Sequence, residues 1–371
     1  MKHALLLLVT GLLAGCARPT PPATGQAAAT TAAGPTATYT NPVWNEDFAD
    51  PTIIRAADGF YYAYATETRR AGQVINIQVA RSADLVRWDY VGDALPVKPA
   101  WASQTDSFWA PHVSEVGGTY YLYFSAKPNS AVGKKDAEAG LCLAVATATS
   151  PAGPFTPTAA PLQCGTGFVN IDPMQFDDPA TGKRLLYWGS GFGPLKVREL
   201  APDRVSFAPG SQVMDLIFPI KDDDPDNYQK LVEGSWVTYH DGWYYLLFSG
   251  DNCCGDKAHY AVMAARSRSA TGPFQTLAQA TGGQRRTVLA RSERWLAPGH
   301  NSVVTDAAGQ PWLAYHAIDT GRKTFTAVNA EQEGSRRVML LDRLEYGADG
   351  WPRLAATPSG TAQPAPATWA R

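Results

Sequence analysis

Short apolar, aromatic-rich segments recur along the chain, each after a turn and before small or polar residues. Five segments share this pattern at a spacing of roughly 60 residues, typical of arrayed structural units: DGFYYAYAT (58–66), GGTYYLYFSA (117–126), GKRLLYWGS (182–190), DGWYYLLFSG (241–250) and GQPWLAYHA (309–317). An apolar run rich in Tyr, Trp and Phe and bounded by Gly predicts a β-strand, and Asp-Gly favours a tight turn before it.

Further strand-like segments lie between these repeats. They are QVINIQVARS (73–82), GLCLAVATATS (140–150) and HYAVMAARSRS (259–269). No long stretch has the 3.6-residue periodicity of an amphipathic helix, and the 33 Gly and 28 Pro residues would interrupt helices. The pattern therefore predicts an all-β protein.

Five units of this size predict a five-bladed β-propeller, in which four-stranded antiparallel blades surround a central axis. A large β-sandwich is the alternative, but its strands recur about every 8 to 12 residues and do not need the longer period. We expect one propeller domain over residues 39–355 and a flexible C-terminal tail over residues 356–371.

The composition fits a packed domain that acts on a neutral ligand. Hydrophobic residues make up 45% of the 371 residues, aromatic residues make up 11%, and the formal net charge is −2. Nucleic-acid-binding proteins usually present a basic face, so we expect no nucleic-acid partner.

The first 16 residues have the features of an export signal. Lys2 precedes the apolar segment ALLLLVTGLLAG, which is too short to span a membrane. It ends in LLAGC, which is similar to the signal of bacterial lipoproteins, in which the cysteine, here Cys16, is lipidated. We expect an exported lipoprotein on the periplasmic or cell surface; an ordinary secretory signal is the alternative. Residues 17–38, rich in Ala, Pro and Thr, should form a flexible tether.

Four cysteines remain after the signal, and an even number in an exported protein is typical of disulfides. A bond between Cys142 and Cys164 would close one loop. Cys253 and Cys254 are adjacent, so they form either a vicinal disulfide or two thiols. Four cysteines allow three pairings, and the sequence does not choose among them.

Three acidic residues occupy similar positions ahead of three of the repeats. Asp50 lies in NEDFADPTII, Asp172 in VNIDPMQF and Glu233 in KLVEGSWVTY. Burying a carboxyl group in an apolar strand is unfavourable without a compensating role. For each acid alone, a structural role is the alternative. Because propeller strands converge on the axis, three acids in register predict one shared cavity.

The segments FADPTII, NIDPMQF and LVEGSWV resemble, in this order and spacing, the signature of glycoside hydrolase family 43. The resemblance covers residues 41–354 and implies a five-bladed β-propeller that hydrolyses glycosidic bonds with inversion. It implies that Asp50 is the general base and Glu233 the general acid, and that Asp172 tunes and orients the acid. This chemistry requires no cofactor.

Inverting hydrolysis needs one carboxylate to activate water and one protonated carboxyl group to donate to the leaving oxygen. We therefore expect burial and the nearby negative charge of Asp172 to raise the pKa of Glu233. Asp50 should stay ionised.

Several neighbouring residues are candidates for substrate contact. SFWAPHV (107–113) resembles the family's Trp-Ala-Pro segment, so Trp109 is expected to form a platform for a sugar ring, with core packing as the alternative. His112 stands where an acid often follows in the family, and it is a candidate for local substrate contact. Trp44 and Phe48 are expected to form a wall beside the first acid.

Two further segments resemble family elements near the axis. In RWLAPGHNSVV the resemblance implies that His300 lies beside a calcium or sodium ion, the alternative being hydrogen bonds to core water. His316 is expected to be structural. The closing segment EGSRRVMLLDRLEYGADGWP resembles a strand whose arginine reaches the sugar, with Arg337 as first choice and Arg336 as second.

The loop SGDNCCG resembles arabinanase-like members of the family. We therefore expect a monomeric, inverting hydrolase that cleaves α-L-arabinofuranosyl linkages in arabinan or arabinoxylan. A β-xylosidase on the same frame is the first alternative, and a propeller that binds glycan without cutting it is the second. Endo or exo action is left open.

Overall fold

The computed structural model describes residue 1 and residues 37–135, 138–326, 333–355 and 358–369. The predicted signal and most of the predicted tether, including Cys16, lie outside the described residues. No helix among the described residues has both the length and the apolar character needed to cross a bilayer.

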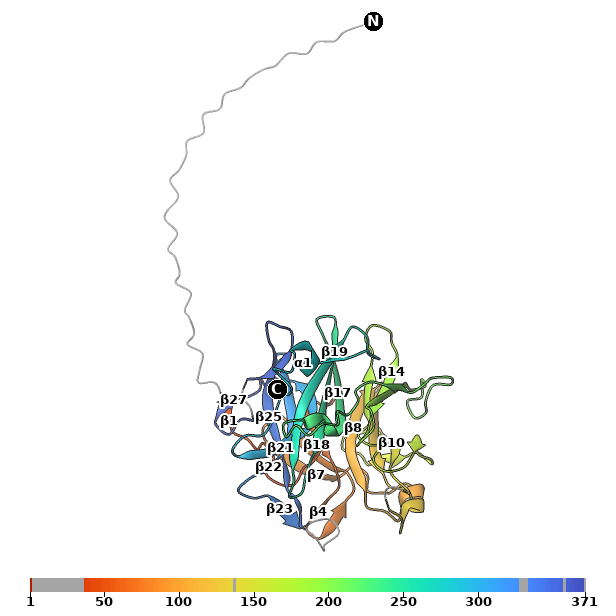
Figure 1. Ribbon diagram of the computed structural model, residues 1–371. Helices are drawn as coiled ribbons and strands as arrows, with labels where there is room; N and C mark the ends of the chain where they lie inside the picture. The colour runs from red at the N-terminus through yellow and green to blue at the C-terminus, as the bar shows by residue number, and fades with distance from the viewer. Residues whose placement is uncertain (2–36, 136–137, 327–332, 356–357, 370–371) are drawn as a thin grey trace. The chain divides into compact units, whose positions relative to one another are not determined.

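Five small antiparallel sheets surround a central axis and form a five-bladed β-propeller (Figure 1). Blade 1 contains, in chain order, β2 (Thr52–Arg55), β3 (Tyr61–Ala65), β6 (Gln78–Ser82) and β7 (Trp88–Asp93). Blade 2 contains β8 (Phe108–Val116), β9 (Thr119–Ala126), β10 (Cys142–Ala148) and β11 (Thr156–Pro157). A short fifth strand, β12 (Gln163–Cys164), also pairs with β10. The predicted all-β propeller is therefore confirmed.

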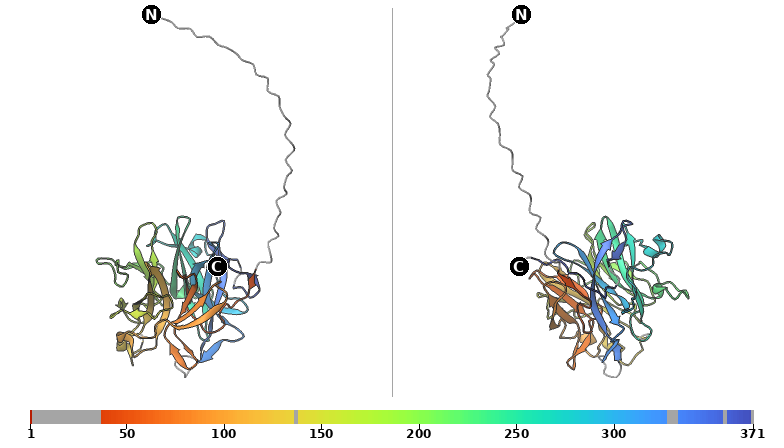
Figure 2. Two further views of the ribbon diagram at one scale, coloured as in Figure 1. Left: turned by 180° about the vertical axis from the view of Figure 1, so that it is seen from behind. Right: turned by 90° about the vertical axis from the view of Figure 1, so that its left-hand side faces the viewer.

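The remaining three blades have the same four-stranded order. Blade 3 contains β13 (Met174–Asp177), β14 (Arg184–Trp188), β15 (Lys196–Glu199) and β16 (Met214–Asp215). Blade 4 contains β17 (Val232–His240), β18 (Trp243–Asn252), β19 (His259–Ser267) and β20 (Gln275–Thr276). Blade 5 contains β21 (Trp295–Thr305), β22 (Pro311–Asp319), β25 (Arg337–Tyr346) and β26 (Pro352–Leu354). Figure 2 shows the blades from behind and from the side.

Smaller elements decorate the blades. Two hairpins pair β4 (Thr68–Arg70) with β5 (Gln73–Ile75), and β23 (Thr324–Thr326) with β24 (Glu333–Ser335). The helical elements among the described residues are single turns: η1 (Ala100–Ala102), η2 (Asn129–Ala131), η3 (Tyr228–Lys230) and α1 (Leu277–Ala280).

The five repeated segments are the second strands of the five blades: β3, β9, β14, β18 and β22. Each second strand is hydrogen-bonded on both edges and is packed on both faces, so nearly all of its residues are buried. A strand buried on both faces reads as a continuous apolar run and does not alternate. This burial explains why the repeats are visible in the sequence.

The first strand of each blade contains or closely follows a residue with a positive φ. The five residues and their φ values are Asp50 (58°), Ala110 (51°), Asp172 (58°), Gly234 (61°) and Ala297 (46°). Such angles are uncommon outside glycine, and residues held there cluster at functional sites. The sequence places Asp-Pro, Ala-Pro or Gly at these positions, so the five blades share one backbone turn near the axis.

The polar residue at the end of a repeated segment holds the first strand of the next blade. In four of the five blade junctions its side chain accepts a backbone N–H from that strand. The backbone N–H donors and their side-chain acceptors are Ala110 to Thr66 Oγ1 (2.9 Å), Asp172 to Ser125 Oγ (3.0 Å), His300 to Ser249 Oγ (2.8 Å) and Asp50 to His316 Nδ1 (3.1 Å). The repeat therefore encodes the contact between blades as well as the strand.

The ends of the described propeller close the ring between blades 5 and 1. The N-terminal segment follows β25, where the N–H groups of Val43 and Phe48 donate to Met339 O (3.0 Å) and Arg337 O (2.8 Å). We expected a flexible tail after residue 355, but β27 (Gln363–Pro364) pairs with β1 (Thr38–Tyr39), beside each other in Figure 1. Ala and Pro dominate this tail, yet backbone pairing and the indole of its last described residue, Trp369, fix it to the domain.

Two disulfides lie within the described part of the chain. Cys142 and Cys164 form one with an S–S distance of 1.96 Å, between β10 and β12. Cys253 and Cys254 form a vicinal disulfide in the loop after β18.

Candidate active site

A cavity of about 340 Å³ lies where the five blades meet, and all three predicted acids line it. Asp50, Asp172 and Glu233 come from blades 1, 3 and 4. Asp50 and Asp172 are only 6% and 5% exposed. The shared backbone turn of the first strands therefore brings together residues that are far apart in the chain.

Glu233 reaches the cavity from a slightly different position than the two aspartates. Asp50 and Asp172 themselves have the positive φ, whereas in blade 4 that residue is Gly234 and the acid precedes it. A register shift between Glu233 and Trp236 accompanies the turn. The three acids are thus not strictly equivalent, although they share one cavity.

Asp50 is surrounded by cationic and hydrogen-bonding groups. Arg337 Nη1 lies 3.1 Å and His300 Nδ1 lies 3.4 Å from Asp50 Oδ1, and the Thr66 hydroxyl donates to Oδ2. Burial alone would raise the pKa of Asp50, but the Arg337 guanidinium, helped by His300, holds it well below its usual range. Asp50 is therefore a carboxylate at neutral pH.

Burial raises the pKa of Glu233 to about 7, and the negative charge of Asp50 adds to this shift. The Tyr260 hydroxyl, which donates to Glu233 Oε1 at 2.8 Å, and the Arg337 guanidinium oppose it. Glu233 can therefore hold a proton near neutral pH.

The protonation of Asp172 depends on that of Glu233. Burial, followed by the negative charges of Glu233 and Asp50, raises the pKa of Asp172 well above its usual range. Two carboxyl groups that repel each other in a largely desolvated cavity cannot both ionise easily, so the Asp172–Glu233 pair retains a proton. Asp172 Oδ2 also accepts the Gly234 N–H at 2.9 Å, which fixes the backbone beside the acid.

Trp109 and Arg337 also line the cavity. The Trp109 indole donates from Nε1 to Glu67 Oε1 (3.0 Å) and stacks on Phe168, with ring centroids 6.3 Å apart and planes 12° apart. Arg336, the second choice for the sugar-binding arginine, is buried elsewhere and bonds to Asn45.

The structure does not bring His112 or Trp44 to the cavity. A register shift after Trp109 turns the His112 ring toward Trp236, 5.4 Å between centroids, and burial lowers the pKa of His112 to about 3. Trp44 packs on Phe48, with centroids 5.6 Å apart, and bridges to β25. Trp44 and Phe48 are therefore part of the packing between the N-terminal segment and its neighbours.

The donor set around His300 does not suit a cation by itself. His300 Nδ1 faces the carboxylates of Asp50 and Asp172, at 3.4 and 3.6 Å. Across the described part of the chain, no group of three or more His, Cys, Asp or Glu side chains is arranged to hold a metal. Unpartnered buried atoms of His316 and Asn301 offer one imidazole and one amide, while calcium prefers several oxygen ligands. The expected ion stays a prediction.

Sequence reasoning missed four kinds of contact in this cavity. Thr66 was visible only as the polar end of a repeat, and Tyr260 carried no signal beyond its strand. Phe168 lies in a loop segment, where periodicity gives no orientation. The cavity position of Cys253 and Cys254 depends on how the loop after β18 folds back.

A propeller whose axial cavity holds one carboxylate with a lowered pKa and one carboxyl group with a raised pKa has the kind of pair that glycoside hydrolases use for acid–base catalysis. The family model "Glycosyl hydrolases family 43" matches residues 39–352. The chain belongs to this family, and the protein is a glycosidase.

Relatives and solved structures agree with this assignment. The chain is 26% identical over 328 residues to extracellular exo-alpha-(1->5)-L-arabinofuranosidase ArbA of Cellvibrio japonicus, covering 83% of this chain and 86% of the relative. It is 27% identical over 320 residues to extracellular endo-alpha-(1->5)-L-arabinanase 1 of Bacillus subtilis, covering 83% and 88%. The crystal structure of a thermostable family-43 glycoside hydrolase matches with a TM-score of 0.69 and 26% identity, covering 89% of this chain and 99% of that one.

Proposed function

We propose that the protein is an inverting hydrolase of α-L-arabinofuranosyl linkages in arabinan or arabinoxylan side chains. The observation that carries the proposal is the pair Asp50 and Glu233, which line one cavity and have pKa values shifted in opposite directions. The relatives named for exo- and endo-acting enzymes on (1->5)-linked arabinose support the choice of sugar. Because both kinds occur, the exo or endo mode stays open.

Asp50 acts as the general base in this proposal. Its carboxylate accepts a proton from a water molecule as that water attacks the anomeric carbon. The Arg337 guanidinium and the Thr66 hydroxyl hold the carboxylate in place. They also keep it ionised, although it is almost completely buried.

Glu233 acts as the general acid. Because Oε1 accepts the Tyr260 hydroxyl, Oε2 is the oxygen left to carry the proton to the leaving group. After this transfer the new carboxylate is stabilised by the same hydroxyl and by the nearby guanidinium of Arg337. Asp172 positions Glu233 by accepting the N–H of Gly234, and the Asp172 and Glu233 carboxyl groups share a proton. Asp172 therefore contributes to catalysis without contacting the leaving oxygen.

Two substitutions and a substrate panel test this assignment. Asp50→Asn and Glu233→Gln should each lower kcat by about 10²- to 10⁴-fold, because each removes one proton-transfer group. Asp241→Asn is the matched control, since the Asp241 side chain is 87% exposed in a turn, and it should keep wild-type activity. Rates are measured on an aryl α-L-arabinofuranoside, an aryl β-D-xyloside and linear arabinan.

The panel also separates the alternatives. Wild-type cleavage of the xyloside alone would replace the arabinosidase proposal with a β-xylosidase, and no cleavage of any substrate would favour a glycan-binding propeller. Full activity in either acid variant would remove that residue from the mechanism. Proton NMR of the first anomer released tests inversion.

Export is a further part of the proposal. The two curated relatives named above are extracellular proteins, which supports export of this chain as well. Lipid anchoring through Cys16 and the monomeric state remain predictions.

A further inference from the structure

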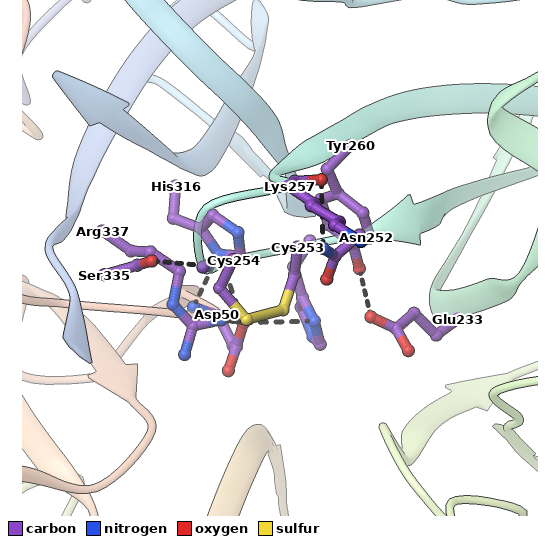
Figure 3. The surroundings of a disulfide bond; sticks show 12 residues. Asp50, Glu233, Asn252, Cys253, Cys254, Lys257, Tyr260, His316, Ser335 and Arg337 are labelled. Carbon is purple, nitrogen blue, oxygen red and sulfur yellow. Dashed lines mark hydrogen bonds and ion pairs between the residues drawn. A yellow bond between two sulfur atoms is a disulfide. The ribbon is translucent and has the colours of Figure 1, made fainter. Parts of the chain in front are cut away.

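The Cys253–Cys254 disulfide is part of the wall of the catalytic cavity. Both cysteines line it together with Asp50, Glu233 and Arg337. Figure 3 shows the two sulfur atoms in the space between the Asp50–Arg337 side and Glu233. A sugar bound between the base and the acid would therefore meet this disulfide.

The loop that carries the disulfide is fixed at several points. The Gly255 N–H donates to Ser335 Oγ at 2.7 Å, which ties the loop of blade 4 to β24, close to Arg337. Within the loop, Asn252 Nδ2 donates to Lys257 O at 3.0 Å. At its base, His259 Nδ1 lies 2.6 Å from Asp251 Oδ2. The disulfide is thus presented on a preorganised support, which is what a precise binding wall needs.

The chemistry of the disulfide complements the rest of the cavity. The acids, His300 and Arg337 supply hydrogen-bonding groups, whereas Trp109 and Phe168 supply a flat apolar surface. A pentose has hydroxyl groups at its edges and C–H groups on its faces. Sulfur is polarizable and carries no strong hydrogen-bonding group, so it suits a C–H face.

We infer that the Cys253–Cys254 disulfide is a specificity-determining contact that packs against a neutral sugar ring held between Asp50 and Glu233. This inference rests on the proposed arabinoside substrate for the identity of that ring. The contact is the same in the bound substrate and in the transition state, because the disulfide takes no part in proton transfer. Its loss should therefore raise KM and leave kcat nearly unchanged.

Kinetics of a double variant give the first test. Cys253→Ser/Cys254→Ser should raise KM for the cleaved arabinoside by roughly fivefold to tenfold, the effect of uncovering about 50 Å² of apolar surface, with kcat within about twofold. The matched control is Cys142→Ser/Cys164→Ser, which removes a disulfide that does not line the cavity. The control should leave KM unchanged. An unchanged KM in the Cys253/Cys254 variant would overturn the inference.

Protection from reduction gives a second test that does not depend on the variant folding. Glu233→Gln protein is treated with a phosphine reductant, with and without arabino-oligosaccharide. Thiols are trapped with iodoacetamide and assigned by peptide mass. Bound oligosaccharide should slow reduction of Cys253–Cys254 by at least about fivefold, the ratio expected when more than 80% of the sites are occupied and shielded. It should not slow reduction of Cys142–Cys164.

The two tests separate this inference from the proposed function. If the wild-type protein cleaves arabinosides but KM and the reduction rate of Cys253–Cys254 do not respond, the disulfide does not contact the sugar and the function stands. If the wild-type protein cleaves no arabinoside, the proposed function is wrong, and the sugar ring that contacts the disulfide is then not an arabinose. Calorimetry on the Glu233→Gln protein verifies that oligosaccharide is bound in the protection experiment.

Discussion

Asp50 is buried and Glu233 partly buried in one cavity, and their neighbours decide which of the two carboxyl groups carries a proton. Arg337 lies 3.1 Å from Asp50, whereas the donor that contacts Glu233 is the neutral hydroxyl of Tyr260. A full positive charge stabilises a carboxylate more than a single neutral donor does. In the proposed mechanism, the division between base and acid therefore depends on the position of one guanidinium.

The pH dependence of kcat/KM tests the part played by Tyr260. The proposed mechanism requires protonated Glu233, whose pKa of about 7 places the alkaline limb there; activity should be kept below that pH and lost above it. The acidic limb belongs to Asp50 and lies well below the usual carboxyl range. Tyr260→Phe removes a donor to the carboxylate, so the pKa of Glu233 rises and the alkaline limb should move up by about one pH unit.

Tyr123→Phe is the control for this shift. Tyr123 is also fully buried, but its hydroxyl donates to a backbone carbonyl, that of Arg204, at 2.8 Å. This variant should lose some stability and keep both limbs of the pH profile. An alkaline limb that stays in place in Tyr260→Phe would show that Tyr260 does not tune the acid.

Residue identity alone predicted part of this site. The three acids, Trp109 and Arg337 line one cavity, as their motifs, which fix both residue type and strand position, led us to expect; their roles stay predictions. His112 and Trp44 were placed wrongly because a register shift and the packing of the N-terminal segment decide where those rings point. Tyr260 on β19 contacts Glu233 on β17 although β18 lies between these strands in the sheet, and no local pattern encodes such a contact.

The junction between blades 3 and 4 differs from the other four. Ser190 ends the third repeat, yet its hydroxyl has no partner among the described residues, although its own N–H donates to Val232 O at 2.8 Å. The first strand of blade 4 is instead held by Asp172, which accepts the Gly234 N–H. A carboxylate of the candidate site thus makes a contact that a hydroxyl or an imidazole makes at the other junctions.

A pair of Ser→Ala substitutions tests the junction bonds. Ser125→Ala leaves the buried Asp172 N–H without its acceptor and should lower the free energy of unfolding by about 1–3 kcal/mol. Ser190→Ala removes a hydroxyl that is equally buried but unpartnered, and should change stability by less than about 0.5 kcal/mol. Denaturant unfolding measures both. Equal losses would mean that burial of the serine, and not the bond, stabilises the junction.

For the individual strands, the sequence predicted position best where a strand is buried on both faces. The five second strands were visible as continuous apolar runs, and their number predicted the number of blades. The β4–β5 hairpin was not predicted, because β4 and β5 are short and only partly buried; the strand-like segment 73–82 is divided between β5 and β6. The β23–β24 hairpin is also short, with no apolar repeat to mark it.

The propeller is closed without exchange of a strand between its first and last blades. Blades 1 and 5 are each made from a continuous part of the chain. The seam between them is covered by the N-terminal segment on β25 and by the C-terminal residues. The Ala367 N–H donates to Asp306 Oδ2 (2.9 Å) in blade 5, and Trp369 Nε1 donates to the Tyr61 hydroxyl (3.1 Å) in blade 1.

Truncation of the C-terminal residues tests how much their contacts at the seam contribute to stability. A chain that ends at residue 357 loses the β1–β27 pairing and the contacts of Ala367 and Trp369, and should be destabilised by about 2–5 kcal/mol. A chain that ends at residue 369 keeps these contacts and is the control. Thermal unfolding followed by circular dichroism compares the two. No loss of stability on truncation at 357 would show that the seam holds without the C-terminal residues.

Because Thr38 pairs with Pro364, the two termini of the ring lie side by side at the seam. Each blade is made from one continuous part of the chain, so the architecture does not require that blade 1 be translated first. A few linking residues across the seam and a new opening in an exposed turn, such as Gly117–Gly118, would give a circular permutant with the same five blades. The acids would then follow a different order along the chain while meeting in the same cavity.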